Sequence, residues 1–242
     1  MKKLAVLVLL VASCGGKLFA QDMEAEPKQN LLEISAGYCS ALPPFSNAST
    51  SATFLKPRSG GSMSFSYARL ITDEWGAQVE VLTSAFKVKT SDLASEVKGG
   101  AVSQVSIDPY RSTFFGAGAV AFLPIAGLTL GVKGSVGVNV VEFATQDFSF
   151  KSNQTGSPMQ SVTVSAKRSV APGALLGVRF RYPVGESVYV GAKVEYGISY
   201  ADFTNVKYQV NALPSNPDPL TLENFRKTLS YLNAGVVLGL RF

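Results

Sequence analysis

The chain has 242 residues, of which 46% are hydrophobic, and it contains 22 Lys or Arg, 17 Asp or Glu, two Cys and no His. The absence of histidine excludes Ser–His and Asp–His catalytic pairs, and with so few cysteines it leaves no Cys/His zinc site. The formal charge of +5 does not indicate nucleic-acid binding, because no stripe of basic residues interleaved with aromatics is present.

Residues 1–20 have the layout of a secretory signal peptide. Two lysines precede an apolar run at 4–12, and small residues lead to Ala20. The run is too short to span a bilayer, so we expect cleavage after Ala20. Lipoprotein processing at Cys14 is the alternative, since Val-Ala-Ser precedes it. Cleavage after Ala20 leaves 19 basic and 17 acidic residues, with Cys39 as the one remaining cysteine, so no intramolecular disulfide is expected.

The rest of the chain is organised as strands. We expect a short periplasmic segment at 21–30 and one domain at 31–242. A membrane helix is not expected there, because it would need about 18 consecutive apolar residues and the sequence has no such stretch after the signal peptide. Such an exported, apolar, glycine-rich chain indicates either a soluble β-sandwich or an outer-membrane β-barrel. Eight segments alternate with a period of two, as strands do: 31–39, 62–71, 76–86, 112–122, 128–143, 170–182, 187–200 and 229–242.

The connections between these segments alternate in length. The second and third segments, the fourth and fifth, and the sixth and seventh are joined by the short stretches TDE, LPIAG and PVGE. The other four connections, near 40–61, 87–111, 144–169 and 201–228, are each about twenty residues long. Short periplasmic turns and long extracellular loops are typical of outer-membrane barrels, whereas a sandwich has no reason to alternate in this way. The sequence therefore predicts an all-β, eight-stranded, antiparallel, up-and-down transmembrane β-barrel.

Aromatic residues near the strand ends predict interfacial girdles. The expected girdle residues are Tyr67, Trp75, Phe122 and Tyr182 toward the short turns, and Tyr38 and Tyr200 toward the long loops. In segment 112–122 the alternation does not show which face points outward, because the residues of both faces are small or apolar.

Charged residues share the strand face opposite the apolar one. They are Glu33, Glu80, Lys133, Arg179, Lys193 and Glu195, with Arg181 and Arg241 nearer the periplasmic rim. An eight-stranded barrel leaves an interior just wide enough for side chains, and an unpaired buried ion costs several kcal/mol. We therefore expect an interior salt-bridge network; an ion or proton path is the alternative.

The C-terminal segment, NAGVVLGLRF, ends on an aromatic residue preceded by alternating apolar residues. In this respect the chain resembles small eight-stranded outer-membrane barrels of Gram-negative bacteria, of the OmpA/OmpX-like type, and YARLITDEWG resembles barrels of the Bacteroidota. The resemblance implies that the barrel-assembly machinery reads Phe242, Leu240, Leu238 and Val236 as an insertion signal.

Function is expected in the long loops, because loops on a rigid scaffold carry binding. We expect a hairpin at 148–164 and about one helical turn at 218–225. The motif GAGAVA is not a nucleotide site, since a strand follows it, and no cofactor is expected. The leading hypothesis is a non-catalytic, porin-like outer-membrane protein. It would contact membrane lipid and envelope partners through its loops, as a scaffold or as a subunit of a larger assembly. A narrow channel is the alternative, and an enzyme is disfavoured.

Overall fold

The computed structural model describes residues 30–46, 57–88, 100–143, 145–152, 160–164, 167–204, 206–212, 219–221 and 225–242. The expected signal peptide, Cys14 and residues 21–29 lie outside this part of the chain. Within it, no helix has the length and apolar character needed to cross a membrane.

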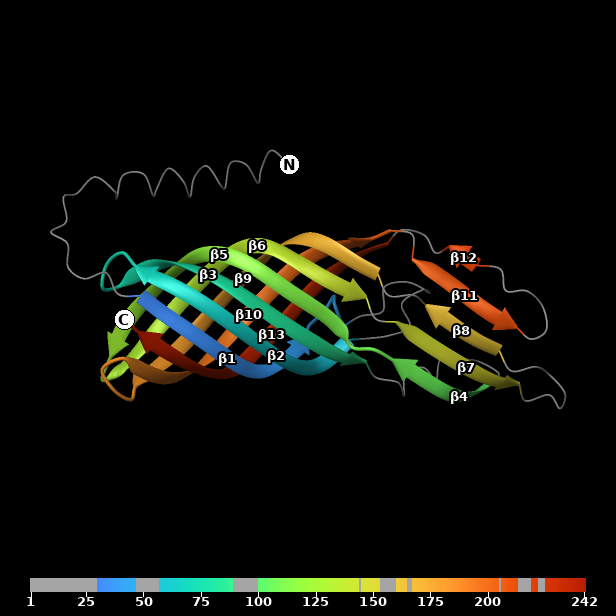
Figure 1. Cartoon of the computed structure of the whole chain (residues 1–242), viewed down its shortest axis with the longest axis horizontal. Coiled ribbons are helices and arrows are strands. Elements are labelled where there is room, and N and C mark those ends of the chain that lie inside the picture. The colour runs from blue at the N-terminus through green and yellow to red at the C-terminus, as the bar shows by residue number, and fades with distance from the viewer. Residues whose placement is uncertain are drawn as a thin grey trace, which may run out of the picture.

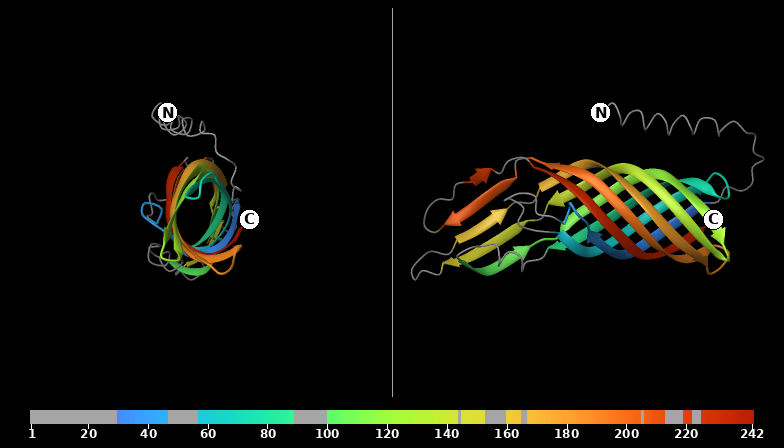
Figure 2. Two further views of the ribbon diagram at one scale, coloured as in Figure 1. Left: turned by 90° about the vertical axis from the view of Figure 1, so that its left-hand side faces the viewer. Right: turned by 180° about the vertical axis from the view of Figure 1, so that it is seen from behind.

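Eight strands close into an antiparallel barrel, in the order β1-β13-β10-β9-β6-β5-β3-β2 (Figures 1 and 2). They are β1 (Asn30–Ala41), β2 (Pro57–Leu70), β3 (Trp75–Val88), β5 (Tyr110–Ile125), β6 (Leu128–Phe143), β9 (Lys167–Pro183), β10 (Val188–Phe203) and β13 (Phe225–Arg241). The predicted fold is confirmed, and β6 has the bounds that the alternation predicts. Most of the other strands begin or end a few residues beyond their predicted limits, because pairing continues past the apolar residues.

The first and last strands seal the barrel. β1 pairs with β13 from Leu31↔Arg241 to Ala41↔Tyr231. Beyond this ladder, the amide of Asn30 donates to the carbonyl of Phe242 at 2.7 Å, and the amide of Phe242 donates to the carbonyl of Asn30 at 3.0 Å. The closed wall has no free edge, so the backbone groups of the strands are paired within the sheet.

The short connections lie at the end of the barrel where the chain terminates (Figure 1). Between β5 and β6, Ala126 and Gly127 have φ of 44° and 83°. Positive φ at both residues is what a two-residue type I′ hairpin requires. The turn between β2 and β3 is closed by the amides of Ile71 and Thr72, which donate to the carbonyl of Trp75 at 2.9 and 3.1 Å.

The outside of the barrel is apolar and the inside is polar. Val136, Val170 and Val236 leave 69–70% of their surface exposed on the outer face, whereas Glu80 and Lys133 are buried inside. A soluble sandwich would bury its apolar face, and a soluble monomer rarely exposes so continuous an apolar surface. The exposed band is therefore the lipid-facing surface of a membrane-spanning barrel, and closed antiparallel barrels of this kind belong to the bacterial outer membrane.

Five of the six expected girdle residues lie on the outer face. Tyr38, Tyr182 and Tyr200 are more than half exposed, and Tyr67 and Trp75 are partly buried. The Tyr67 hydroxyl donates to the side-chain oxygen of Asn30 at 2.7 Å.

The girdle assignment of Phe122 is wrong. This side chain points into the barrel and is 5% exposed, while the neighbouring Leu123 is 53% exposed outside. The two faces of β5 are similar in polarity, so alternation alone left its orientation open, and pairing with β3 and β6 decides it.

A second sheet lies beyond the long-loop end of the barrel (Figures 1 and 2). It has the order β12-β11-β8-β7-β4 and consists of β4 (Gly100–Ile107), β7 (Gln146–Ser152), β8 (Gln160–Val164), β11 (Lys207–Ala212) and β12 (Pro219–Thr221). The expected hairpin is present as the β7–β8 pair. The sequence did not predict that strands from three connections join into one sheet.

The predicted helical turn at 218–225 is wrong where it is described. Pro219–Thr221 forms β12, which pairs with β11, and Phe225 already belongs to β13. Asp218 and residues 222–224 lie outside the described residues. Pro219 suits the first position of an edge strand as well as the first turn of a helix, so its presence did not distinguish the two.

Candidate functional site: the barrel interior

The structure brings the six predicted interior charges together inside the barrel. Each is at most 7% exposed, and the set is Glu33, Glu80, Lys133, Arg179, Lys193 and Glu195. Arg181 joins them at 6% exposure. They project from five strands because each lies on the face opposite the lipid-facing residues of its strand.

Two lysines and two glutamates form the central cluster. Lys133 forms ion pairs with Glu80 and with Glu195, the latter at 2.6 Å. Lys193 pairs with Glu195 at 2.9 Å and donates to the Ser64 hydroxyl at 2.7 Å. The Glu80–Lys133 and Lys133–Glu195 contacts connect β3 with β6 and β6 with β10, which are not neighbours in the sheet. The four charges balance, as burial in so narrow a space requires.

A second cluster surrounds Glu33, on the periplasmic side. One of its carboxylate oxygens is 2.6 Å from Arg181 and accepts a hydrogen bond from the Tyr189 hydroxyl at 2.9 Å. The other accepts from Arg179 and, at 3.1 Å, from the Ser66 hydroxyl. Four donors thus converge on one carboxylate.

Gln78 links the two clusters. Its side-chain oxygen accepts from Arg179 at 3.0 Å, and its side-chain nitrogen donates to Ser135 at 3.0 Å and to Glu80 at 3.3 Å. The two charged clusters therefore form one continuous network. The sequence reasoning missed Gln78, although its position two residues before Glu80 places it on the same face of β3.

An aromatic plug closes the barrel above the central cluster, toward the second sheet. Its members are at most 2% exposed: Phe45, Phe86, Tyr110, Phe143, Phe203 and Tyr231. Successive rings meet edge to face, with centroids 5.2 Å apart for Phe45–Phe86 and 5.3 Å apart for Tyr110–Phe143. Tyr231 packs over Gly197, where an added Cβ would lie 2.3 Å from its ring.

Phe45 reaches the plug because the segment after β1 turns back into the barrel mouth. The Leu42 amide donates to the Ser230 carbonyl at 2.8 Å, and the Ser230 hydroxyl lies 3.0 Å from the carbonyl oxygens of both Leu42 and Pro43. Lys227 lies beneath this segment, 4% exposed, with its ammonium 5.5 Å from the Phe45 ring centroid and 5.2 Å from that of Tyr110. Alternation could not have identified Phe45, since it lies in a connection.

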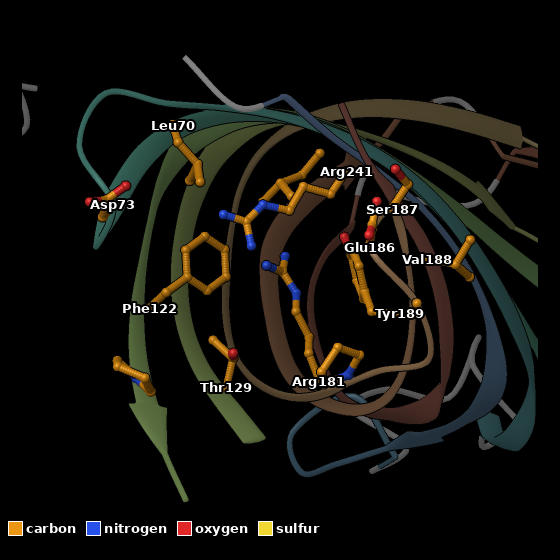
Figure 3. A pocket seen from close by; sticks show the side chains of 14 residues that line it. Leu70, Asp73, Phe122, Thr129, Arg181, Glu186, Ser187, Val188, Tyr189 and Arg241 are labelled. Atoms are coloured by element: carbon orange, nitrogen blue, oxygen red, sulfur yellow. The ribbon is translucent and has the colours of Figure 1, made fainter. Parts of the chain in front are cut away.

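A pocket of about 310 Å³ opens at the periplasmic end (Figure 3). Arg181 extends into it between two rings, 4.0 Å from the centroid of Phe122 and 4.8 Å from that of Tyr189. Arg241 points into the same space from β13. The inward-facing Phe122 thus stacks on a guanidinium group.

No metal-binding cluster was found among the side chains that the structure describes: no three His, Cys, Asp or Glu residues are grouped so that they could hold an ion. The interior charges are arranged for mutual pairing, with lysine and arginine alternating with carboxylates. The expectation that the chain is not an enzyme stays a prediction.

Comparison with known proteins gives structural similarity alone. No protein-family model matches the chain, and no curated protein matches it. It is similar to a major outer membrane protein from Thermus thermophilus, with 13% identity, 90% of this chain and 100% of that chain covered, and a TM-score of 0.47. It is also similar to Ail, the attachment invasion locus protein of Yersinia pestis, with 12% identity, 90% of this chain and 100% of that chain covered, and a TM-score of 0.43. The outer membrane protein OprG from Pseudomonas aeruginosa is similar with 16% identity, 89% of this chain and 97% of that chain covered, and a TM-score of 0.43.

The central cluster makes a prediction about stability. Glu195→Gln leaves Lys133 and Lys193 with one full carboxylate between them, so we expect it to lower the free energy of unfolding by about 3 kcal/mol in guanidinium titrations of the folded barrel. The control is Glu142→Gln, because Glu142 pairs with Arg168 at 3.4 Å on the exposed outer face. That change is expected to cost about 1 kcal/mol or less. Equal losses in the two variants would contradict the paired-interior interpretation.

The aromatic plug makes a prediction about thiol access. Cys39 is fully buried in the same cluster, and its thiol lies 3.3 Å from the Gly61 carbonyl. We expect a charged thiol reagent to modify the native protein slowly, and Phe45→Ala to raise the rate by about tenfold or more because it opens the mouth above the thiol. Phe65→Ala, on the lipid-facing surface, should leave the rate unchanged. Rapid labelling of the unaltered protein would show that the plug does not close the barrel.

Proposed function

We propose that this chain is a non-catalytic outer-membrane protein that acts as a surface scaffold, and that its second sheet contacts another component of the cell envelope. The observation that carries the proposal is that three long connections build one ordered five-stranded sheet beyond the membrane end of the barrel. Connections that only shielded the rim would have no need to pair with one another.

The edges of this sheet support an interaction role. Among the strands that the structure describes, β4 and β12 each pair on one side only, so one backbone edge of each is unpaired within this sheet. Such edges accept an added strand from a partner, with main-chain hydrogen bonds giving affinity. The membrane-embedded barrel would hold this surface at a constant height above the lipid.

The remaining partner assignments follow from the outer face and the last strand. Val236, Leu238, Leu240 and Phe242 are all exposed on the lipid-facing side, where outer-membrane lipid and the barrel-assembly machinery would meet them. A Bacteroidota origin and membership of a larger outer-membrane assembly stay predictions.

The scaffold proposal is tested by removing the β7–β8 hairpin. Phe143 and Lys167 are already a paired register position of β6 and β9, so Asn-Gly can replace residues 144–166 as a two-residue turn without disturbing the barrel. We expect the shortened protein to reach the outer membrane and to keep its heat-modifiable migration on gels. We also expect it to lose the cross-linked envelope species that the full-length protein forms in intact cells.

The matched control exchanges Ala126–Gly127 for Asn-Gly at the opposite end of the barrel. This variant has the same new turn but an unaltered second sheet, so its cross-links should remain. Retention of all cross-links by the shortened protein would rule out the β7–β8 part of the sheet as the contact surface.

A narrow channel is the second candidate, favoured by the continuous polar network along the interior. Conduction would require both the aromatic plug and the ion pairs to separate, since eight strands enclose packed side chains and not a water-filled pore. We therefore expect no steady porin-like conductance from the purified monomer in planar bilayers. Phe45→Ala alone should not create one, because the ion pairs below remain closed. A large, steady conductance from the unaltered monomer would favour the channel over the scaffold.

A further inference from the structure

The periplasmic pocket is lined by four charged side chains: the guanidinium groups of Arg181 and Arg241 and the carboxylates of Asp73 and Glu186. Arg181 and Arg241 extend into one space from β9 and β13 (Figure 3). Two like charges that face a common space repel each other, and an anion placed between them offsets that repulsion. A neighbouring side chain or a bound ligand can supply that anion.

Glu33 does not have the capacity to do so. Its two carboxylate oxygens already serve Arg179, Arg181, Tyr189 and Ser66. Arg181 is 6% exposed, and its Nε has no hydrogen-bond partner in the described residues. Buried donors without acceptors are rare in native proteins and costly, so this one calls for an acceptor.

The Arg241 side chain is more exposed than that of Arg181. No ion pair involving its guanidinium is found within the residues that the structure describes, although Asp73 and Glu186 also line the pocket. These two carboxylates disfavour a multiply charged anion through repulsion, but they tolerate a single negative charge held between two guanidinium groups.

The remaining walls are largely apolar and hold Arg181 in place. Phe122 and Tyr189 stack on its guanidinium, and Leu31 and Leu70 line the same space. A stacked guanidinium presents its planar donor fork in a fixed direction, which suits two-point recognition of a carboxylate. A volume of about 310 Å³ is enough for a small organic molecule.

We propose that this pocket is a binding site for a small organic monocarboxylate with an apolar body that enters from the periplasm. The carboxylate accepts hydrogen bonds from Arg181 and Arg241, and the apolar body lies against Phe122, Leu31 and Leu70. This site and the extracellular contact surface proposed above lie at opposite ends of the barrel. The proposal of the binding site does not depend on the proposal of the contact surface.

The test is calorimetric titration of the purified, folded barrel in non-ionic detergent at low salt, with benzoate as the probe. Arg241→Gln is the informative variant, because the exposed Arg241 side chain takes no part in the interior ion pairs. We expect benzoate to bind the unaltered protein saturably. In the variant we expect its affinity to fall by about tenfold or more, because a charged hydrogen bond is lost. Arg69→Gln is the matched control: Arg69 is at the same end but on the outer face, so affinity should not change.

Two further probes examine the chemistry of the site. Benzamide, which has the same ring but no charge, should not bind measurably, and inorganic phosphate should compete poorly because it lacks the apolar body. Heat-modifiable migration confirms that each variant is folded. The proposal is overturned if benzoate shows no saturable binding, if Arg241→Gln binds it as tightly as the unaltered protein, or if benzamide binds equally well.

Discussion

Lipid offers no hydrogen bonds to a polypeptide backbone, and the rest of this structure depends on that constraint. The wall must close on itself, as it does where Asn30 and Phe242 exchange backbone hydrogen bonds. Once the wall is closed and its outer surface is apolar, the charged residues in the middle of the strands lie inside. The interior is then too narrow for free water, so its charges must be neutralised by one another. The buried network of Glu33, Glu80, Glu195 and their basic partners follows from membrane insertion as directly as the apolar exterior does.

The interior is graded along its axis. Aromatic rings close the end beneath the second sheet, balanced ion pairs occupy the centre, and a pocket rich in guanidinium groups opens to the periplasm. Chemical groups that can meet ligands are thus confined to the two ends, while the centre is occupied by contacts among the barrel's own side chains. This division separates the proposed extracellular contact surface from the proposed periplasmic site, so that each can be altered without the other.

Much of this arrangement could be predicted from alternation alone. A period of two predicts the orientation of each residue wherever the two faces differ in polarity, which is why the sequence alone places Lys133 on β6 and Glu195 on β10 inside the barrel. The same reasoning had no answer for β5, whose faces are alike, and Phe122 was misplaced for that reason. Phe45 and the second sheet depend on pairing between segments far apart in the chain. The pattern within one segment of the sequence does not indicate such contacts.

Several of the interior ion pairs connect strands that are not neighbours, and this bears on the order of events during assembly. Glu33 on β1 meets Arg179 on β9, whereas β1 is hydrogen-bonded to β2 and β13. An open, curling sheet has its strand pairs but cannot form these contacts, and its charges would face either lipid or a half-formed cavity. Formation of the contacts between distant strands therefore coincides with closure, so their favourable free energy is gained in that step. Incomplete barrels lack the contacts between distant strands, such as Glu33–Arg179, so these contacts favour the sealed state over one opened at the β1–β13 seam.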